Sequence, residues 1–191
     1  MLNRIAVTVL ASGMLLAAGC SQKAPTPTVN ASMTQVIAPQ TQTIWDITNR
    51  AYNTAGDGLD PSKISPADWD QLEKAAGQLR DRALVLSKAA HITAAGRGET
   101  IMGQDASGAT GKLGHTWDAA SSKRVQAMID ANPALFAERA RILAKAGDTI
   151  VRASQTKDVR SVYKVASGLD EDCDGCHKPF WGTDEPPPFP R

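Results

Sequence analysis

The residues with the clearest chemical potential lie near the C-terminus, where Cys173, Cys176 and His177 form a Cys-x-x-Cys-His pattern. Two thiols separated by two residues can hold a metal ion, form a redox-active disulfide or bind haem covalently. The adjacent imidazole adds a ligand that suits both zinc and haem iron. Which chemistry applies depends on the compartment, on the other cysteines and on the elements that carry the motif.

The first nineteen residues predict export. Arg4 gives a positively charged start, Ile5 to Ala18 is an apolar stretch, and small residues precede Cys20. This end resembles the lipobox of bacterial lipoproteins, in which the chain is cut before the cysteine and the cysteine is acylated. An ordinary signal peptide with an incidental cysteine is the alternative. We interpret residues 1–19 as a lipoprotein signal peptide and Cys20 as the lipidated residue.

A polar segment follows the lipidation site. Residues 20–32 contain Pro25 and Pro27 and predict a flexible tether between lipid and domain. We therefore expect a domain anchored on the periplasmic side of a bacterial membrane, and by the lipoprotein analogy Ser21 favours the outer membrane. With Cys20 acylated, Cys173 and Cys176 are the remaining pair of the three cysteines in an oxidising compartment.

Length and composition exclude several classes of function. A chain of 191 residues predicts one domain of ordinary size. Loss of Arg4 with the signal peptide lowers the formal net charge from +1 to zero, so nothing indicates a nucleic-acid partner. The body of the chain has no apolar run long enough to span a bilayer. No phosphate-binding loop or Ser-His-Asp arrangement is evident, so we expect no enzyme.

Helical periodicity occurs four times, and the first two stretches lie in the N-terminal half. The first runs from about Met33 to Thr54, with Pro39 either kinking it or marking the first turn of its main part. The second begins with Ser65 as cap and Pro66 in the first turn. Its apolar stripe advances in steps of three and four and comprises Trp69, Leu72, Ala76, Leu79, Ala83, Leu86 and Ala90.

The other two helices are predicted beyond Asn132. The third begins at Asn132–Pro133, and Gly147 interrupts it as a tolerated weak spot. The fourth is capped by Asp158 and carries Cys173 and His177 on one face. Residues expected to face inward from the third are Phe136, Ala140, Leu143, Ala146, Ile150 and Ala153.

Four amphipathic helices predict an all-α domain, a four-helix bundle over residues 33–181, with cofactor sites between facing helices. A short helix is also expected at 121–131. Glycines make a stable helix unfavourable across the stretch 92–117, which we expect to be a long loop. Residues 182–191 form a proline-rich tail, either a plain extended terminus or a segment that docks a partner.

Three alternatives compete with covalent haem at the cysteine pair. A structural zinc site needs a fourth ligand, for which only His91 and His115 remain. A thioredoxin-like dithiol needs a βαβ context, which the pattern lacks. A structural disulfide is the third. Export and the helical setting favour one covalent haem c, with thioether bonds at Cys173 and Cys176 and His177 as the proximal iron ligand.

The run "CDGCHKPFW" resembles the CxxCHxxF run of the class II c-type cytochromes, which are the cytochrome c prime family and its low-spin relatives. "MTQVIAPQTQTIWDI" and "DVRSVYKVASGLDEDCDGCHKPFW" are similar to a less characterised branch. The resemblance covers residues 33–181. Two features depart from it: Trp181 stands where many members have Arg, and the stretch 92–117 is rich in glycine. The resemblance implies a haem on the last helix, so little chain is expected after it.

The resemblance also implies two functions, which differ in the sixth iron ligand. Members with a Met on the first helix are low-spin carriers of single electrons between redox partner proteins. Members without that ligand are five-coordinate and bind nitric oxide or carbon monoxide. Met33 lies where the low-spin relatives have their ligand, so it is either the sixth ligand or a core residue. Members often form dimers, which allows a homodimer here. Weaker ligand candidates are His91, His115, Met102 and Met128, while Trp45, Trp69 and Trp117 suit packing.

Overall fold

The computed structural model describes residues 26–97, 99, 101 and 122–181, and these parts are mostly helical. No β-strand occurs within them, although an isolated bridge joins Tyr52 and Leu59. The predicted all-α class is therefore confirmed. Residues 1–19, Cys20 and the tail 182–191 lie outside the described residues. The elements are α1 (Val29–Ser32), η1 (Met33–Ile37), α2 (Ala38–Arg50), η2 (Pro61–Lys63), α3 (Pro66–Ser87), α4 (Ser122–Ala131), α5 (Pro133–Thr156), α6 (Val159–Ala166) and α7 (Leu169–Trp181).

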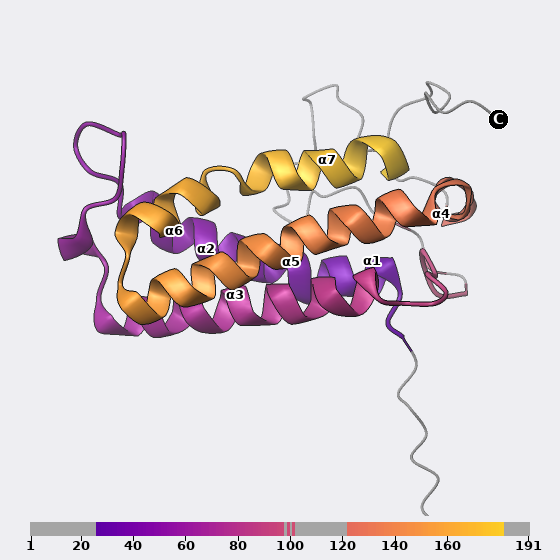
Figure 1. Ribbon diagram of the computed structural model, residues 1–191, viewed down its shortest axis with the longest axis horizontal. Coiled ribbons are helices and arrows are strands. Elements are labelled where there is room, and N and C mark those ends of the chain that lie inside the picture. The colour runs from indigo at the N-terminus through magenta and orange to yellow at the C-terminus, as the bar shows by residue number, and fades with distance from the viewer. Residues whose placement is uncertain (1–25, 98, 100, 102–121, 182–191) are drawn as a thin grey trace, which may run out of the picture.

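The long helices lie side by side and alternate in direction (Figure 1). α3 and α5 form the most extensive contact, α2 packs on α3, and both α6 and α7 pack on α5. All predicted inward residues of α5 are buried, and so are those of α3 up to Leu86. Ala90, the last residue of the expected α3 stripe, is exposed, because α3 ends at Ser87.

The three predicted helix caps are confirmed. The Ser65 hydroxyl accepts a hydrogen bond from the Asp68 amide at 3.2 Å, and the Asp68 carboxylate accepts one from the Ser65 amide in return. Asn132 accepts from the Leu135 amide at 3.4 Å. Asp158 accepts from the first-turn amides of α6. Each cap satisfies amides that have no partner within the helix, so these starts are encoded locally.

The first helix begins earlier and ends sooner than expected. It starts at Val29, where the Thr28 hydroxyl accepts from the Ala31 amide at 3.0 Å, and it stops at Arg50 instead of Thr54. The amide of Val29 also donates to the carbonyl of Thr93 at 2.8 Å. Residues 29–32 are thus helical and not part of a tether, and a distant loop helps to fix the helix start.

A π-helical turn, η1, interrupts this first helix immediately before Pro39. The amide of Ala38 donates to the carbonyl of Met33, five residues back. Pro39 has no amide proton, and its ring would collide with the carbonyl four residues earlier in a regular helix. The wider turn accommodates the proline, and it brings Met33 and Ile37 to the start and end of the bulge.

The predicted fourth helix is two helices, which corrects the continuous helix expected from Asp158 to Cys176. α6 ends at Ala166 and α7 starts at Leu169. The Ser167 hydroxyl donates to the Tyr163 carbonyl at 2.8 Å, and the Gly168 amide donates to the Val165 carbonyl at 3.0 Å. These two hydrogen bonds end α6 at Ala166. α7 then starts as a separate helix at Leu169 and carries the cysteine motif.

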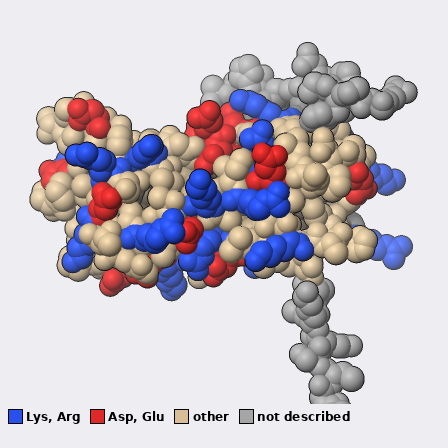
Figure 2. All heavy atoms as spheres, in the orientation of Figure 1, with Lys and Arg blue, Asp and Glu red and all other residues tan. Residues whose placement is uncertain are grey.

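Charged side chains of both signs share the face shown in Figure 2. Asp148 on α5 lies 2.8 Å from Arg152 and 3.7 Å from Arg80 on α3. Such exposed pairs contribute little to stability, but they keep the surface mixed in sign. Among the described helices, none is both long enough and apolar enough to cross a membrane.

Candidate cofactor site

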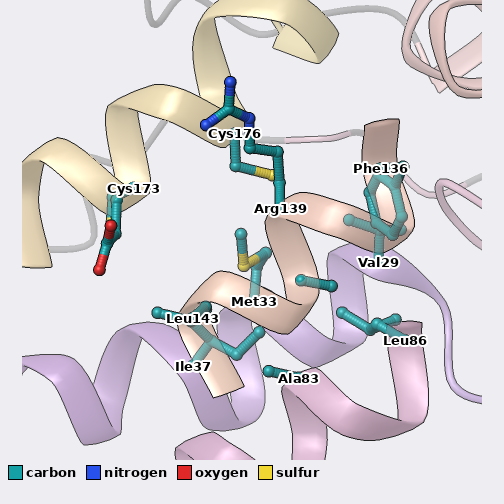
Figure 3. A pocket seen from close by; sticks show the side chains of 12 residues that line it. Val29, Met33, Ile37, Ala83, Leu86, Phe136, Arg139, Leu143, Cys173 and Cys176 are labelled. Atoms are coloured by element: carbon teal, nitrogen blue, oxygen red, sulfur yellow. The ribbon is translucent and has the colours of Figure 1, made fainter. Parts of the chain in front are cut away.

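Cys173 and Cys176 lie on one wall of an apolar pocket between α7 and the helices beneath it (Figure 3). The enclosed free space is about 30 Å³, well below the roughly 300–1,000 Å³ of typical ligand sites, so the walls would have to separate to admit a large cofactor. Apolar side chains of the first helix and α3 form the floor: Val29, Met33, Ile37, Ala83 and Leu86. α5 contributes Phe136, Arg139, Ala140 and Leu143.

Met33 comes from the helix opposite the cysteines. Its side chain points from η1 into the space beneath Cys173 and Cys176 (Figure 3). It is half-buried and packs against the hydrophobic core. The resemblance implied that Met33 is either the sixth ligand or a core residue. The fold brings its thioether sulfur, of a type that binds haem iron, into the cysteine pocket.

His177 lies on α7 within a helical arc of about 100° that also contains both cysteines. The residue is 8% exposed, and it is not among the side chains that line the pocket. Burial lowers the pKa of its imidazole, while the nearby Asp174 carboxylate opposes this shift. A neutral imidazole is the form that binds metal. Among the described residues, no group of three or more His, Cys, Asp and Glu side chains is arranged to hold a metal ion.

The two thiols have pKa values well above that of an ordinary cysteine. Burial, helped by the negative charge of Asp170, raises the pKa of Cys173 to about 12. Burial raises the pKa of Cys176 to about 11, and the positive charge of Arg139 opposes this effect. Both cysteines are free in the structure. Redox-active dithiols have lowered pKa values, so this environment does not favour thioredoxin-like chemistry.

We expect the thiols of the folded, haem-free protein to react slowly with iodoacetamide. Because thiolate is the reactive form and both pKa values are raised, alkylation at pH 7 should be at least about 100-fold slower than for a free cysteine. The rate should rise about tenfold per pH unit up to pH 10. Mass spectrometry of the alkylated chain measures this, with the urea-unfolded protein as control. Equal rates in the folded and unfolded protein would favour a reactive dithiol.

The phenylalanine of the CxxCHxxF run fixes α7 against α5. Phe180 is buried and meets Phe136 edge-to-face, with ring centroids 5.3 Å apart. Phe136 also lines the pocket. This aromatic pair therefore joins the end of the cysteine helix to the pocket wall, and such pairs add about 0.5–1.5 kcal/mol beyond area burial.

Arg139 is the residue of the site that sequence reasoning missed. It stands on the apolar face of α5, three residues after Phe136 and four before Leu143. A charged residue at such a position in an apolar stripe is a sequence feature that could have indicated a binding site. Its Nε is buried and has no hydrogen-bond partner. A cofactor that carries carboxylates, as haem does, would supply the missing acceptor. Together with the thiols and the Met33 sulfur, this donor set fits haem.

The remaining sequence candidates lie elsewhere. His91 is exposed, and Met128 packs against the core away from the pocket. Trp69 is a core residue. Trp45 donates from its indole nitrogen to the Ala166 carbonyl at 3.2 Å and so ties α2 to α6. His115, Met102 and Trp117 lie outside the described residues.

Comparison with protein-family models, with curated proteins and with solved structures finds no match for this chain. The function therefore has to be argued from the site itself.

Proposed function

We propose that this chain is an exported, lipid-anchored c-type cytochrome that carries one covalent haem and transfers single electrons. The observation that carries the proposal is the position of Cys173 and Cys176, one helical turn apart, on the wall of an apolar pocket faced by Met33. A Cys-x-x-Cys-His motif without such a pocket would be only a pattern. When bound, the haem supplies the one-electron redox chemistry.

Each residue of the site has a role in this proposal. The thiols of Cys173 and Cys176 would form the thioether bonds. His177 would provide the proximal imidazole, and because its side chain does not line the pocket, haem binding would have to turn it toward the iron. The apolar walls exclude water, which keeps the local dielectric low and the electrostatic effect of each nearby charge large. No step requires a general acid, a general base or a nucleophile, so we propose a carrier and not an enzyme.

The proposed domain is a four-helix bundle whose four rods are the first helix (α1, η1 and α2), α3, α5 and the α6–α7 pair. Helix contacts link α2 to α3, α3 to α5, and α5 to α6 and α7. The site lies between facing helices, as cofactor sites of bundles do. The lipid anchor at Cys20 and delivery to the periplasmic side of the membrane remain predictions of the sequence.

Met33 favours the electron carrier over a gas-binding protein. Its side chain lines the same pocket as both cysteines, and its turn is a π-bulge, a distortion that is frequent at functional sites. A filled sixth position leaves no room at the iron for nitric oxide or carbon monoxide. We therefore propose Met33 as the sixth ligand and redox partner proteins as the electron donor and acceptor.

The test is an absorption spectrum of the protein purified from cells that attach haem to exported proteins, recorded oxidised, reduced, and reduced under carbon monoxide. We expect sharp low-spin bands that carbon monoxide leaves unchanged. A broad high-spin reduced spectrum that shifts on adding the gas would instead support the gas-binding function. Absence of any covalent chromophore would overturn the haem assignment.

Met33→Ala is expected to convert the reduced spectrum from low-spin to high-spin and to allow carbon monoxide to bind. The physical reason is that alanine removes the only sulfur that the first helix contributes to the pocket. Absorption spectroscopy with and without carbon monoxide measures the change. The matched control is Met128→Ala, because Met128 is also partly buried but does not line the pocket. An unchanged Met33→Ala spectrum would make Met33 a packing residue.

A further inference from the structure

Two charged side chains, Arg139 on α5 and Asp172 on α7, are among the described residues that line the otherwise apolar pocket. Arg139 reaches from α5 toward Cys176 on α7 and lines the pocket beside Phe136 and Leu143 (Figure 3). Its buried Nε has no hydrogen-bond partner. The residue as a whole is half-buried. A buried donor without an acceptor costs free energy, and an apolar residue would avoid this cost. Packing alone therefore does not explain an arginine at this position.

The cysteine helix leaves space for the guanidinium. Gly175 lies between the two cysteines, and a Cβ atom built on it would lie 3.4 Å from Nη1 of Arg139. Arg139 and Cys176 line the same pocket, so the positive charge lies near an atom to which the cofactor would be bonded. Asp172 also lines the pocket, and its negative charge opposes the effect of Arg139 there.

Reduction of a haem takes one electron from a redox partner protein and converts Fe(III) to Fe(II), with no bond made or broken at Arg139. The ferric form carries one more positive charge than the ferrous form. A fixed positive charge in the same low-dielectric pocket raises the free energy of the ferric form more than that of the ferrous form. Reduction therefore becomes more favourable.

We propose that Arg139 tunes the cofactor, and that its positive charge on the pocket wall raises the reduction potential of the haem. This inference rests on the proposed function, because it concerns the same pocket. Arg139 is a tuning residue and neither a thioether site nor an iron ligand. Removing this charge should change the ratio of oxidised to reduced haem about tenfold at a fixed solution potential. That change equals a shift of about 59 mV in the midpoint potential for one electron.

Potentiometric titration of the haem-loaded protein tests the inference with Arg139→Met, which keeps an unbranched apolar side chain on the wall and removes the charge. We expect a lower midpoint potential with unchanged low-spin bands, which would show that the axial ligands are intact. Arg139→Lys should retain most of the wild-type potential, because it keeps the charge. The matched control is Arg141→Met, which removes the same charge from an exposed position on the same helix and should shift the potential much less.

Two outcomes would overturn the tuning role. One is an Arg139→Met potential that equals that of Arg141→Met, and the other is a potential that rises. If Arg139→Met loads haem poorly, Arg139→Gln provides a neutral polar side chain for the same comparison. Wild-type protein without covalent haem would contradict the proposed function, whereas wild-type protein with haem and a potential insensitive to residue 139 would contradict this inference alone.

Discussion

The double variant Cys173→Ser, Cys176→Ser is expected to carry no covalent haem when it is exported from cells that attach haem to c-type cytochromes. Serine keeps the size and the helical position of each side chain, but its hydroxyl does not form a stable bond with a haem vinyl group. Denaturing electrophoresis followed by haem staining measures the covalent pigment directly. The wild-type chain should stain, and the double variant should not.

The single variants provide the internal controls for this experiment. Each retains one thiol on the pocket wall, so a chain that loads haem should hold it through one thioether bond. The remaining free vinyl group extends the conjugated system, so the reduced absorption bands should move to longer wavelength. Staining of the double variant would refute the thioether assignment. Unstained wild-type protein with a Cys173–Cys176 disulfide would favour the structural-disulfide alternative.

Gly147→Ala is expected to destabilise the protein by about 1–3 kcal/mol, as overpacking in a core does. A Cβ atom at Gly147 would lie 2.8 Å from the carbonyl oxygen of Ala76 and 3.0 Å from the backbone nitrogen of Arg80. Both contacts involve the backbone of α3, which cannot move aside without shifting the helix. This clash should exceed the gain of up to about 1 kcal/mol that alanine offers over glycine within a helix.

The matched control is Gly77→Ala on α3. A Cβ atom there would lie 3.9 Å from the Cγ2 atom of Val151, an ordinary contact. This variant should therefore be as stable as the wild type or more stable, by up to about 1 kcal/mol. Urea unfolding followed by circular dichroism measures both free energies. If both alanines had the same effect, close approach of α3 and α5 at Gly147 would not limit the packing.

Local signals made much of the helical structure predictable. Ser65, Asn132 and Asp158 each cap a helix by bonding amides two or three residues further along the chain, so a short window contains the whole interaction. The same holds for the Cys-x-x-Cys-His spacing, because the helical repeat alone brings both cysteines and His177 within one arc of α7. The buried stripes of α3 and α5 follow from their periodicity.

Some errors came from interactions that such a window does not contain, but not all. The start of the first helix is fixed in part by the Thr93 carbonyl, which lies far along the chain. The break between α6 and α7 is local, because the Ser167 hydroxyl and the Gly168 amide donate to carbonyls four and three residues back. Gly147, expected to be a weak spot, lies where α5 passes close to the backbone of α3. Its role becomes visible only when the backbone of α3 is in place.

The sequence by itself determined the helical class, the caps and the spacing of the cysteine motif, because each depends on residues near one another in the chain. Only the tertiary structure decided that Met33, Arg139 and the two cysteines share one pocket. These residues come from three helices that are remote in sequence. These helices come together because their apolar faces are buried, and this driving force has no direction. Which helix packs against which is therefore decided only by the packing of the whole core.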